Sequence, residues 1–472
     1  MKNNYSGASA YKRYQITALP APDIVKWPSL FSVKVKKLGL LKLLLKEIIQ
    51  YRGKKDVILS RPCLYGVFSG PVGGFIPRSE HCVGCLRCTT EFPEFVAVSH
   101  NPKRKLLGDN YFTYNHINSI SYEAETGMVP VRGAGYRGKF GGQGWDGMWT
   151  DMSEIVRPTR DGIHGREFIS TVVDIGSSPN FLNFDGEGNL VGRTSQTFEL
   201  PIPMIIDKLP DSLGSEKSWR IIAKAAQEVG SLAVIPLGEI LQYSLENEHV
   251  VPLVKPGEQG VLSGLNQSPR IIEMYGWDEE LFRNIKEYNP ESLIGLRMAF
   301  TESKQLMRYF RKGVRVFHLL ADYHGIGRKN MFVLDLIRDA HKTFVDAGVR
   351  QEVTLIGGGG IIAAEHIPKA ILCGLDAVGL DTPILVALQA NFIGENVDRN
   401  NSEFRLPSRL SIDWGVQRIK NLLSSWQNQL LEIMGAMGIR EVRRLRGEMG
   451  RAMFMLDLEE AAFMGVDGYE RT

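Results

Sequence analysis

The sequence predicts an α/β protein built on a (β/α)8 TIM barrel, with a loop-rich cysteine region before the barrel and a helical extension after it. Three observations support this prediction. Short apolar runs alternate with amphipathic helical patterns over residues 203–380. A glycine- and proline-rich segment with three closely spaced cysteines precedes them, and long helical patterns follow them. A doubly wound open sheet is the alternative architecture.

The composition indicates an ordered globular protein. Of 472 residues, 43% are hydrophobic and 23% are charged, which is enough apolar material for a large core. The formal net charge of +3 argues against a general nucleic-acid binder. No apolar run is long enough to span a membrane, and the first residues lack the apolar segment of a secretory signal. We therefore expect a cytoplasmic protein with no transmembrane segment.

Four segments are expected along the chain. Residues 1–59 form a basic helical extension, 60–195 a Gly/Pro-rich region of loops and short strands, 196–395 the barrel, and 396–472 a helical extension. Within the first segment, residues 33–50 are expected to form one amphipathic helix, with Leu38, Leu41, Leu45 and Ile48 on one face and Lys42 and Lys46 turned away. Such a helix either docks its leucine face on the protein's own core or contacts a membrane surface or a partner subunit.

The cysteine motif HCVGCLRCTTEFP is the strongest local signal. Cys82, Cys85 and Cys88 have the Cys-x2-Cys-x2-Cys spacing of iron–sulfur ligands, but Phe92 stands where a ferredoxin has its fourth cysteine. A 3Fe–4S cluster needs three thiolates, whereas a 4Fe–4S cluster needs a remote fourth ligand, for which Cys63 is nearest. A zinc site with three cysteines, or thiols that only pack, are the alternatives.

The barrel strands are expected at eight apolar runs, which are residues 203–206, 232–237, 250–254, 270–275, 292–298, 314–320, 352–356 and 375–380. The helix after the first strand is expected to begin at the N-cap Ser215 and to end at Gly230. Glycines follow the last two strands, at Gly357–Gly360 and at Gly379 with Asp381 and Thr382. In barrels, the turns after the seventh and eighth strands form the usual phosphate site, so these turns either bind a phosphate or are tight turns without a ligand.

A third motif, MSEIVRPTRDGIHGREFIS, is dense in ionisable groups. Such a density is typical of an anion site, but an internal salt-bridge network has the same pattern. The residues concerned are Glu154, Arg157, Arg160, Asp161, His164, Arg166 and Glu167.

With the glycine-rich end of the barrel and the tail WGVQRIKNLLSSWQNQLLEIMG, this motif resembles the FMN-binding glutamate synthase family, in its stand-alone or archaeal-type form. The resemblance covers most of the chain from about residue 60 to 465. It implies an FMN-carrying barrel with an iron–sulfur cluster nearby. It also implies an oxidoreductase in which electrons pass through the cluster to FMN, and the flavin hydride reduces 2-iminoglutarate, made from 2-oxoglutarate and ammonia, to glutamate.

Carried over by position, the resemblance assigns site residues. The FMN phosphate turns correspond to Gly358, Gly359, Gly360, Gly379, Asp381 and Thr382. The first strand's end, which lines the flavin, corresponds to Asp207, Lys208 and Ser215. The substrate end of the barrel holds Arg297, which could grip a carboxylate, and His318, Asp322 and His324, of which Asp322 or His324 could move a proton.

The chain also departs from the family. The lysine- and glycine-rich loop after the middle strands is missing, the loop after the sixth strand reads LADYHGIGRKNMF, and no cysteine follows the barrel. We expect no glutaminase domain, so that ammonia is expected to come from solution or from an ammonia-supplying subunit. A ferredoxin-like or other electron-donor protein and an oligomer are expected. The alternative functions are an electron-relay subunit without catalysis and an FMN-dependent 2-hydroxy acid oxidase.

Overall fold

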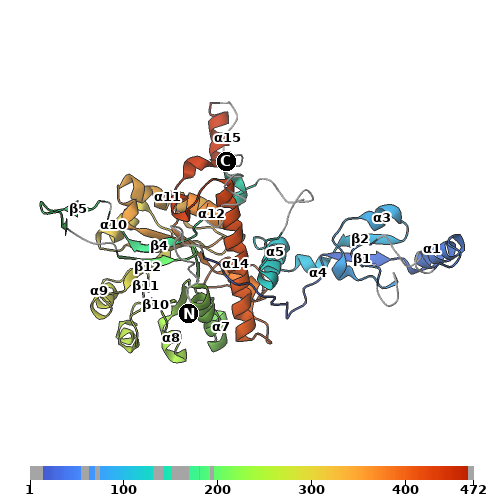
Figure 1. Cartoon of the computed structure of the whole chain (residues 1–472), viewed down its shortest axis with the longest axis horizontal. Coiled ribbons are helices and arrows are strands. Elements are labelled where there is room, and N and C mark those ends of the chain that lie inside the picture. Colours follow the sequence, from blue (N-terminus) through green and yellow to red (C-terminus); the bar gives the residue numbers. More distant parts are fainter. Residues whose placement is uncertain are drawn as a thin grey trace. The chain divides into compact units, whose positions relative to one another are not determined.

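The computed structural model describes residues 14–54, 63–69, 75–130, 142–150, 169–179, 181–191 and 196–465 (Figure 1). The charged motif at residues 152–167 lies outside these ranges. Contacts group the chain into two units, one of residues 25–115 and the other of residues 1–24 and 116–472. The four-segment division expected from the sequence stays a prediction. Among the described residues, no helix is long and apolar enough to cross a membrane.

The larger unit contains a closed parallel barrel of eight strands, as the sequence predicts. In barrel order the strands are β8 (Met204–Ile206), β9 (Ala233–Pro236), β10 (Val250–Val254), β11 (Ile271–Tyr275), β12 (Leu293–Ala299), β13 (Val316–Leu320), β14 (Thr354–Gly358) and β15 (Ala377–Leu380), and β15 pairs with β8 to close the ring. All eight lie at the predicted apolar runs. Because both faces of such strands are covered, they are mostly apolar, and Glu273, Arg297 and His318 are exceptions.

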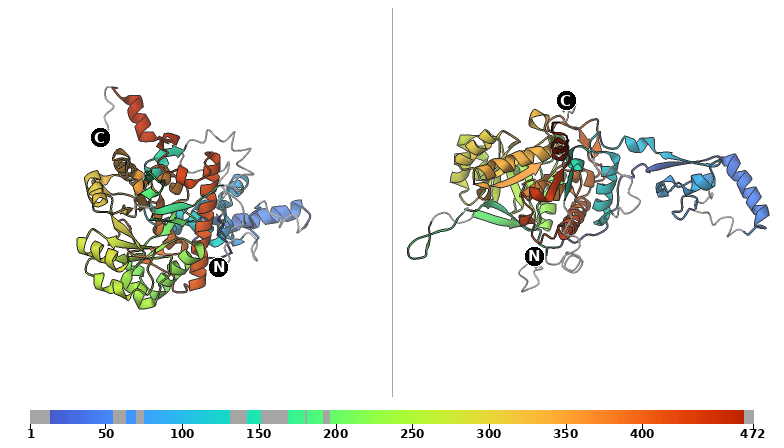
Figure 2. Two further views of the ribbon diagram at one scale, coloured as in Figure 1. Left: turned by 60° about the vertical axis from the view of Figure 1, so that its left-hand side comes forward. Right: turned by 90° about the horizontal axis from the view of Figure 1, so that it is seen from above.

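Helices cover the outside of the barrel (Figure 2). They are α7 (Glu216–Val229), α8 (Leu237–Tyr243), α9 (Glu279–Tyr288), α10 (Ser303–Arg311), α11 (Val333–Asp346), α12 (His366–Leu372), α13 (Thr382–Ala387) and α14 (Ile412–Ala436). The predicted ends of α7 are confirmed, because Ser215 caps it through the N–H of Ser218 and Gly230 ends it at a φ of 70°. α14 packs against α7 with one buried face.

The remaining elements of this unit are short, apart from one helix. They are α5 (Tyr114–Thr126), most of which belongs here, β3 (Met148–Thr150), β4 (Val173–Ser177), β5 (Asn183–Phe184), β6 (Leu190–Val191), β7 (Gln196–Leu200), β16 (Asn391–Phe392), β17 (Phe404–Arg405), β18 (Ala452–Phe454) and α15 (Met455–Phe463). The expectation of only loops and short strands in residues 60–195 is therefore wrong at α5. The buried residues Ile117, Ile120 and Ala124 of α5 recur at helical spacing. Because the surrounding sequence is polar, the hydrophobic periodicity of a helix is weak in this segment.

The smaller unit is a two-stranded ribbon with helices. It contains β1 (Phe31–Val35), α1 (Lys37–Gln50), α3 (Arg87–Glu91), β2 (Val96–His100) and α4 (Pro102–Lys105). The predicted helix over residues 33–50 is wrong at its start, because residues 31–35 pair antiparallel with β2. Val33 and Val35 alternate there with lysines, and this period of two belongs to a strand. None of the α1 side chains is buried, so the expectation that its leucine face docks on the core is not met.

Candidate functional site

Buried charged side chains meet inside the barrel. Asp207 follows β8, Glu273 lies in β11, Arg297 in β12 and His318 in β13, and all four are at most 3% exposed. The guanidinium of Arg297 binds both oxygens of Asp207, with Nη1–Oδ1 at 2.6 Å and Nη2–Oδ2 at 2.9 Å. Its Nη1 also lies 3.2 Å from Oε2 of Glu273. The strand register brings these groups together, because Arg297 lies opposite His318 and next to Glu273's strand.

The protonation of these groups follows from their mutual contacts. Burial alone would raise the pKa of Asp207, but Arg297 and His318 hold it below its ordinary value. Glu273 is likewise buried, and His318 and Arg297 lower its pKa. Burial would lower the pKa of Arg297, yet the two carboxylates raise it. Both carboxylates and the guanidinium are therefore charged, and their mutual contacts stabilise these charges inside the barrel.

His318 completes this cluster through one ring nitrogen. Nδ1 lies 2.7 Å from Oε1 of Glu273 and 3.1 Å from Nη1 of Arg297. Because a guanidinium only donates, the proton on Nδ1 goes to Glu273. Nε2 has no hydrogen-bond partner among the described residues and faces Gly379, where a Cβ would come within 2.9 Å of it. A side chain at position 379 would therefore displace His318.

A second ion pair lies at the end of the eighth strand. Arg399, from the loop between β16 and β17, donates from Nη2 to Oδ2 of Asp381 at 2.6 Å and from Nε to the carbonyl of Ala321 at 2.7 Å. Its Nη1 lies 3.7 Å from Asp207, and its guanidinium stacks on the ring of Tyr323. Burial lowers the pKa of Arg399, but Asp381 and Asp207 raise it, so the side chain is a permanent cation.

The predicted glycine turn after the seventh strand is tightly packed. Gly359 and Gly360 have φ values of 95° and 68°, which favour glycine. A Cβ on Gly359 would lie 2.5 Å from the carbonyl oxygen of Asp322, so this turn directly contacts the turn after β13. The indole N–H of Trp145 donates to the carbonyl of Gly360 at 2.8 Å. The turn is therefore held by Asp322 on one side and by Trp145 on the other. Gly358, at the end of β14, pairs with Gly379 in the neighbouring strand β15.

The other predicted cofactor-binding residues have local partners. The N–H and the hydroxyl of Thr382 both donate to Oδ1 of Asp381, at 2.5 Å and 3.0 Å. The Ser215 hydroxyl accepts from the N–H of Ser218 as the cap of α7. The ammonium of Lys208 pairs with Asp211 at 2.5 Å. These contacts explain the residue types at positions 215 and 382 without any ligand.

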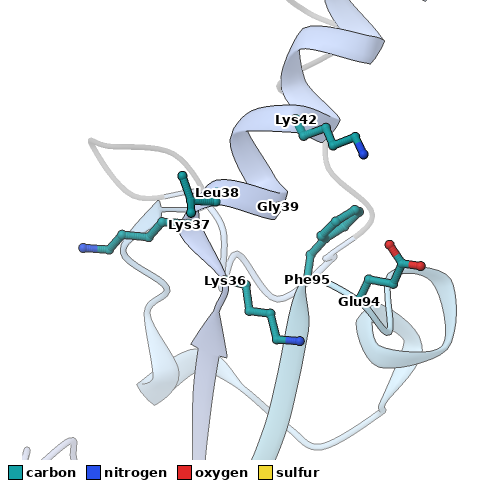
Figure 3. A pocket seen from close by; sticks show the side chains of 7 residues that line it. All are labelled: Lys36, Lys37, Leu38, Gly39, Lys42, Glu94 and Phe95. Atoms are coloured by element: carbon teal, nitrogen blue, oxygen red, sulfur yellow. The ribbon is translucent and has the colours of Figure 1, made fainter.

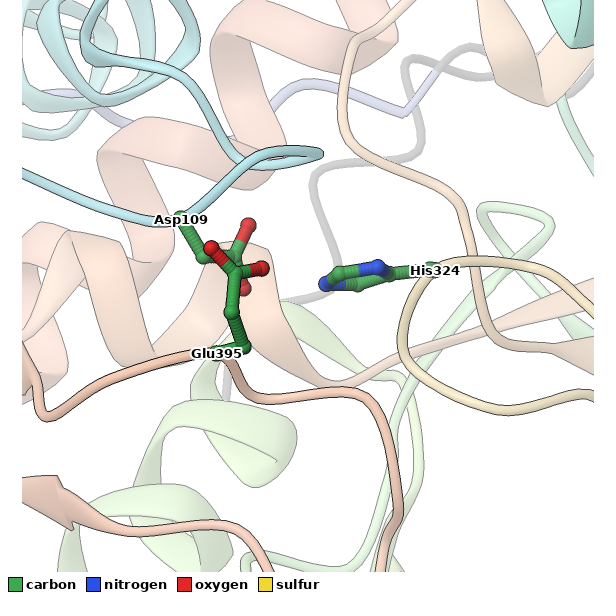
Figure 4. Close-up of side chains that lie close together, drawn as sticks. All are labelled: Asp109, His324 and Glu395. Atoms are coloured by element: carbon green, nitrogen blue, oxygen red, sulfur yellow. The ribbon is translucent and has the colours of Figure 1, made fainter.

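The remaining predicted catalytic residues lie on the turn after β13 and are accessible. Burial raises the pKa of Asp322, and its Oδ1 accepts a hydrogen bond from the N–H of Ile326 at 2.7 Å. His324 lies two residues further on, with a ring nitrogen within 4.8 Å of a carboxylate oxygen of Glu395 (Figure 4). Unlike Arg297 and His318, which lie in the barrel core, Asp322 and His324 are partly exposed.

Four cysteines lie in the smaller unit. Cys63, Cys82 and Cys88 pack beside Val33, Val67 and Val96, while Cys85 is exposed. Burial raises the pKa of Cys82 and of Cys88, and each is raised further by Cys85 and by Cys63. Cys63 therefore belongs to the same group. All four are described, and no three of their sulfurs lie within 4.8 Å of one another.

Sequence reasoning missed Glu273 and Arg399. A single glutamate inside the apolar run IIEMY was the available signal for Glu273, because an isolated carboxylate in a buried strand needs a cationic partner. Arg399 lies in the polar segment NVDRNNS, and nothing in that composition distinguishes an inward arginine from a solvated one.

Comparison with known proteins assigns the family. The model of the conserved region in glutamate synthase matches residues 332–440. The archaeal-type glutamate synthase [NADPH] of Thermotoga maritima is 33% identical over 462 residues, covering 82% of this chain and 90% of that protein. The protein of the same name from Dehalococcoides mccartyi is 24% identical, with the same two coverages. The archaeal glutamate synthase [NADPH] of Archaeoglobus fulgidus is 22% identical, covering 78% of this chain and 84% of that protein. The chain therefore belongs to the glutamate synthase family of oxidoreductases, in its archaeal type.

Proposed function

We propose that the chain is a glutamate synthase-like flavin oxidoreductase, which reduces 2-iminoglutarate or a related small carboxylate with FMN at the carboxyl ends of the barrel strands. The names of the relatives support the reaction. The observation that carries the proposal is the pair of adjacent glycine-containing turns after β14 and β15, joined through Gly358 and Gly379. Turns at this place in a barrel are the usual phosphate site.

The residues present fit an FMN phosphate, although the carboxylate of Asp381 lies close to the phosphate turns. Gly360 lacks the Cβ that would keep phosphate oxygens away from the backbone of this turn, whereas the Cβ direction of Gly359 is filled by the carbonyl of Asp322. The Asp381 carboxylate would repel a phosphate, but Arg399 compensates its charge. Because Thr382 already donates to Asp381, we assign the phosphate to the turn after β14, with Arg399 as the neighbouring cation.

Besides the flavin, the reaction needs a proton donor and cations that bind the substrate carboxylate. When bound, FMN supplies the hydride that adds to the imine carbon of the substrate. Asp322 is the best placed to supply the proton that the imine nitrogen needs, because burial raises its pKa and it lies on the turn that contacts Gly359. Arg297 has both its terminal nitrogens on carboxylates, so it orders Asp207 and Glu273 and leaves the substrate carboxylate to other cations.

We further propose that Cys63, Cys82, Cys85 and Cys88 bind a 4Fe–4S cluster, which supplies electrons when assembled. A tetrahedral zinc ion with bonds of about 2.3 Å needs sulfurs about 3.8 Å apart, and a cubane cluster holds them further apart. The Cys-x2-Cys-x2-Cys spacing of Cys82, Cys85 and Cys88 supports the cluster over zinc, and the packing of Cys63 on the same apolar cluster as Cys82 and Cys88 supports four ligands over the three of a 3Fe–4S cluster. A ferredoxin-like donor, an ammonia-supplying subunit, an oligomeric state and a cytoplasmic location remain part of this proposal.

Anaerobic purification, followed by an absorption spectrum, iron and sulfide assays and identification of the released flavin, tests these cofactors. The activity test supplies 2-oxoglutarate, ammonia and reduced ferredoxin and measures glutamate. Flavin, iron and glutamate formation together support the proposal. A protein that neither retains nor binds added FMN contradicts the flavin assignment, and a flavoprotein whose flavin is reduced in the assay but that makes no glutamate contradicts the substrate.

A further inference from the structure

Helix α1 carries an apolar stripe on its outer side. Leu38 and Ile49 are 85% and 79% exposed, and Leu41, Leu45 and Ile48 are each about half exposed. At 100° per residue these five side chains fall within one quarter to one third of the helix circumference. Single exposed leucines are common on protein surfaces, but five on one face of one helix indicate a contact surface.

The orientation of this stripe is fixed by the other side of the helix. The first turn of α1 sits on Phe95, so close that a Cβ on Gly39 would lie 2.3 Å from the ring (Figure 3). The N–H of Lys36 donates to the carbonyl of Phe95 at 2.9 Å, which ties the start of the helix to the segment before β2. Leu40, Leu43 and Leu44 are half-buried on this inner side. The outer stripe is therefore held facing away from the ribbon.

Lysines border the stripe. Lys42 and Lys46 follow one edge of it, and both are exposed. Residues 34–54 contain seven basic residues and one acidic residue, in a chain whose formal net charge is only +3. Lys36, Lys37 and Lys42 also line an open groove of about 800 Å³, in which Glu94 is the one acidic residue (Figure 3). The apolar stripe thus lies within a strongly positive surface.

We propose that α1 binds an anionic lipid surface, with the stripe inserted among the acyl chains and the lysines at the headgroups. An aliphatic face bordered by lysines is typical of helices that lie in the plane of a membrane. With 14 residues, α1 is too short to span one. A protein partner is the less favoured occupant, because protein interfaces are enriched in aromatic residues and depleted in lysine, whereas this stripe contains only leucine and isoleucine.

Co-sedimentation of the full chain with vesicles tests this proposal. The protein should sediment with vesicles that contain phosphatidylglycerol and much less with phosphatidylcholine alone, and added salt should release it. Lys42→Glu/Lys46→Glu should lower the partition coefficient at least about 30-fold, because each surface lysine contributes about fivefold. Leu41→Gln/Leu45→Gln should lower it by about tenfold or more. The matched control is Lys217→Glu/Lys304→Glu, two exposed lysines on α7 and α10, which should bind like the wild type.

Several outcomes would overturn the proposal. The proposal is wrong if the protein sediments with neither kind of vesicle, or if the control and the α1 variants bind equally well. It is also wrong if the leucine substitutions leave vesicle binding unchanged and alter only the mass that analytical ultracentrifugation measures. The last result would mean that the stripe pairs copies of the chain. Because the altered side chains are exposed, the variants should keep the wild-type circular dichroism and cofactor content. A failure of the proposed enzymatic function would leave vesicle binding unaffected, so the two results are distinguishable.

Discussion

Arg297 and Asp207 form a two-point ion pair in the interior of the barrel, across the gap between the fifth strand and the end of the first. The guanidinium also touches Glu273, which in turn holds His318. Because both ends of its guanidinium are bound to carboxylates, Arg297 is not available to a substrate. The sequence alone predicts instead that Arg297 binds a substrate carboxylate. Arg297 instead holds together the side chains of Asp207 after β8, Glu273 on β11 and, through Glu273, His318 on β13.

Replacement of Arg297 by Met should destabilise the protein by about 3–5 kcal/mol, because Asp207 and Glu273 would remain buried with one cation fewer. Urea unfolding at neutral pH measures this loss. Arg220→Met is the matched control, since the partly exposed Arg220 pairs with Glu216 and donates to the carbonyl of Tyr243, and these two contacts contribute about 2 kcal/mol or less. Equal losses in the two variants would show that the buried network does not depend on Arg297.

Cys63 should be the fourth cluster ligand. Cys85→Ser should lose most of the iron, because it removes a ligand from the central motif. Cys63→Ser should leave a three-iron cluster, which electron paramagnetic resonance of the oxidised protein detects. Cys373→Ser is the control, because burial in the barrel unit raises the pKa of that thiol to about 12 and makes it a poor ligand. Full retention of a four-iron cluster in Cys63→Ser would rule out this assignment.

Arg399 should determine FMN affinity through Asp381. In Arg399→Gln, the carboxylate of Asp381 would stand uncompensated beside the phosphate, and we expect the FMN dissociation constant to rise about tenfold or more. Removing both charges in Asp381→Asn/Arg399→Gln should restore part of the affinity. Quenching of FMN fluorescence on addition of apoprotein measures both. Arg405→Gln, an exposed arginine in β17, should bind as the wild type does. Unchanged binding in Arg399→Gln would remove it from the site.

The barrel could be predicted from the sequence because its strands are short apolar runs and its helices carry clear caps, such as Ser215 and Gly230. The start of α1 was misplaced because Val33 and Val35 fit either period until their pairing with β2 is known. The inner network was beyond prediction for a different reason. Glu273 and Arg297 meet only after the fourth and fifth strands have been aligned in register, and no local pattern contains that register.

His341 should make stability depend on pH. Its ring lies between Gly374 and Gly447, and Nδ1 accepts a hydrogen bond from Nε of Arg350 at 3.0 Å. Burial, together with the Arg350 cation, lowers the pKa of His341 to about 4. Because the folded-state pKa lies below the unfolded value of about 6.5, the stabilisation is complete above pH 6.5 and is lost as the pH falls towards 4.

The size of this effect is at most about 3 kcal/mol, and solvent access to the partly buried ring reduces it. Urea unfolding midpoints at pH 7.5 and pH 5 should therefore differ more in the wild type than in His341→Gln. The glutamine side chain can still accept a hydrogen bond from Arg350 but does not titrate. The variant therefore separates the effect of protonating position 341 from the effect of its packing. Equal pH dependence in both proteins would mean that other groups, and not His341, bind the proton on unfolding.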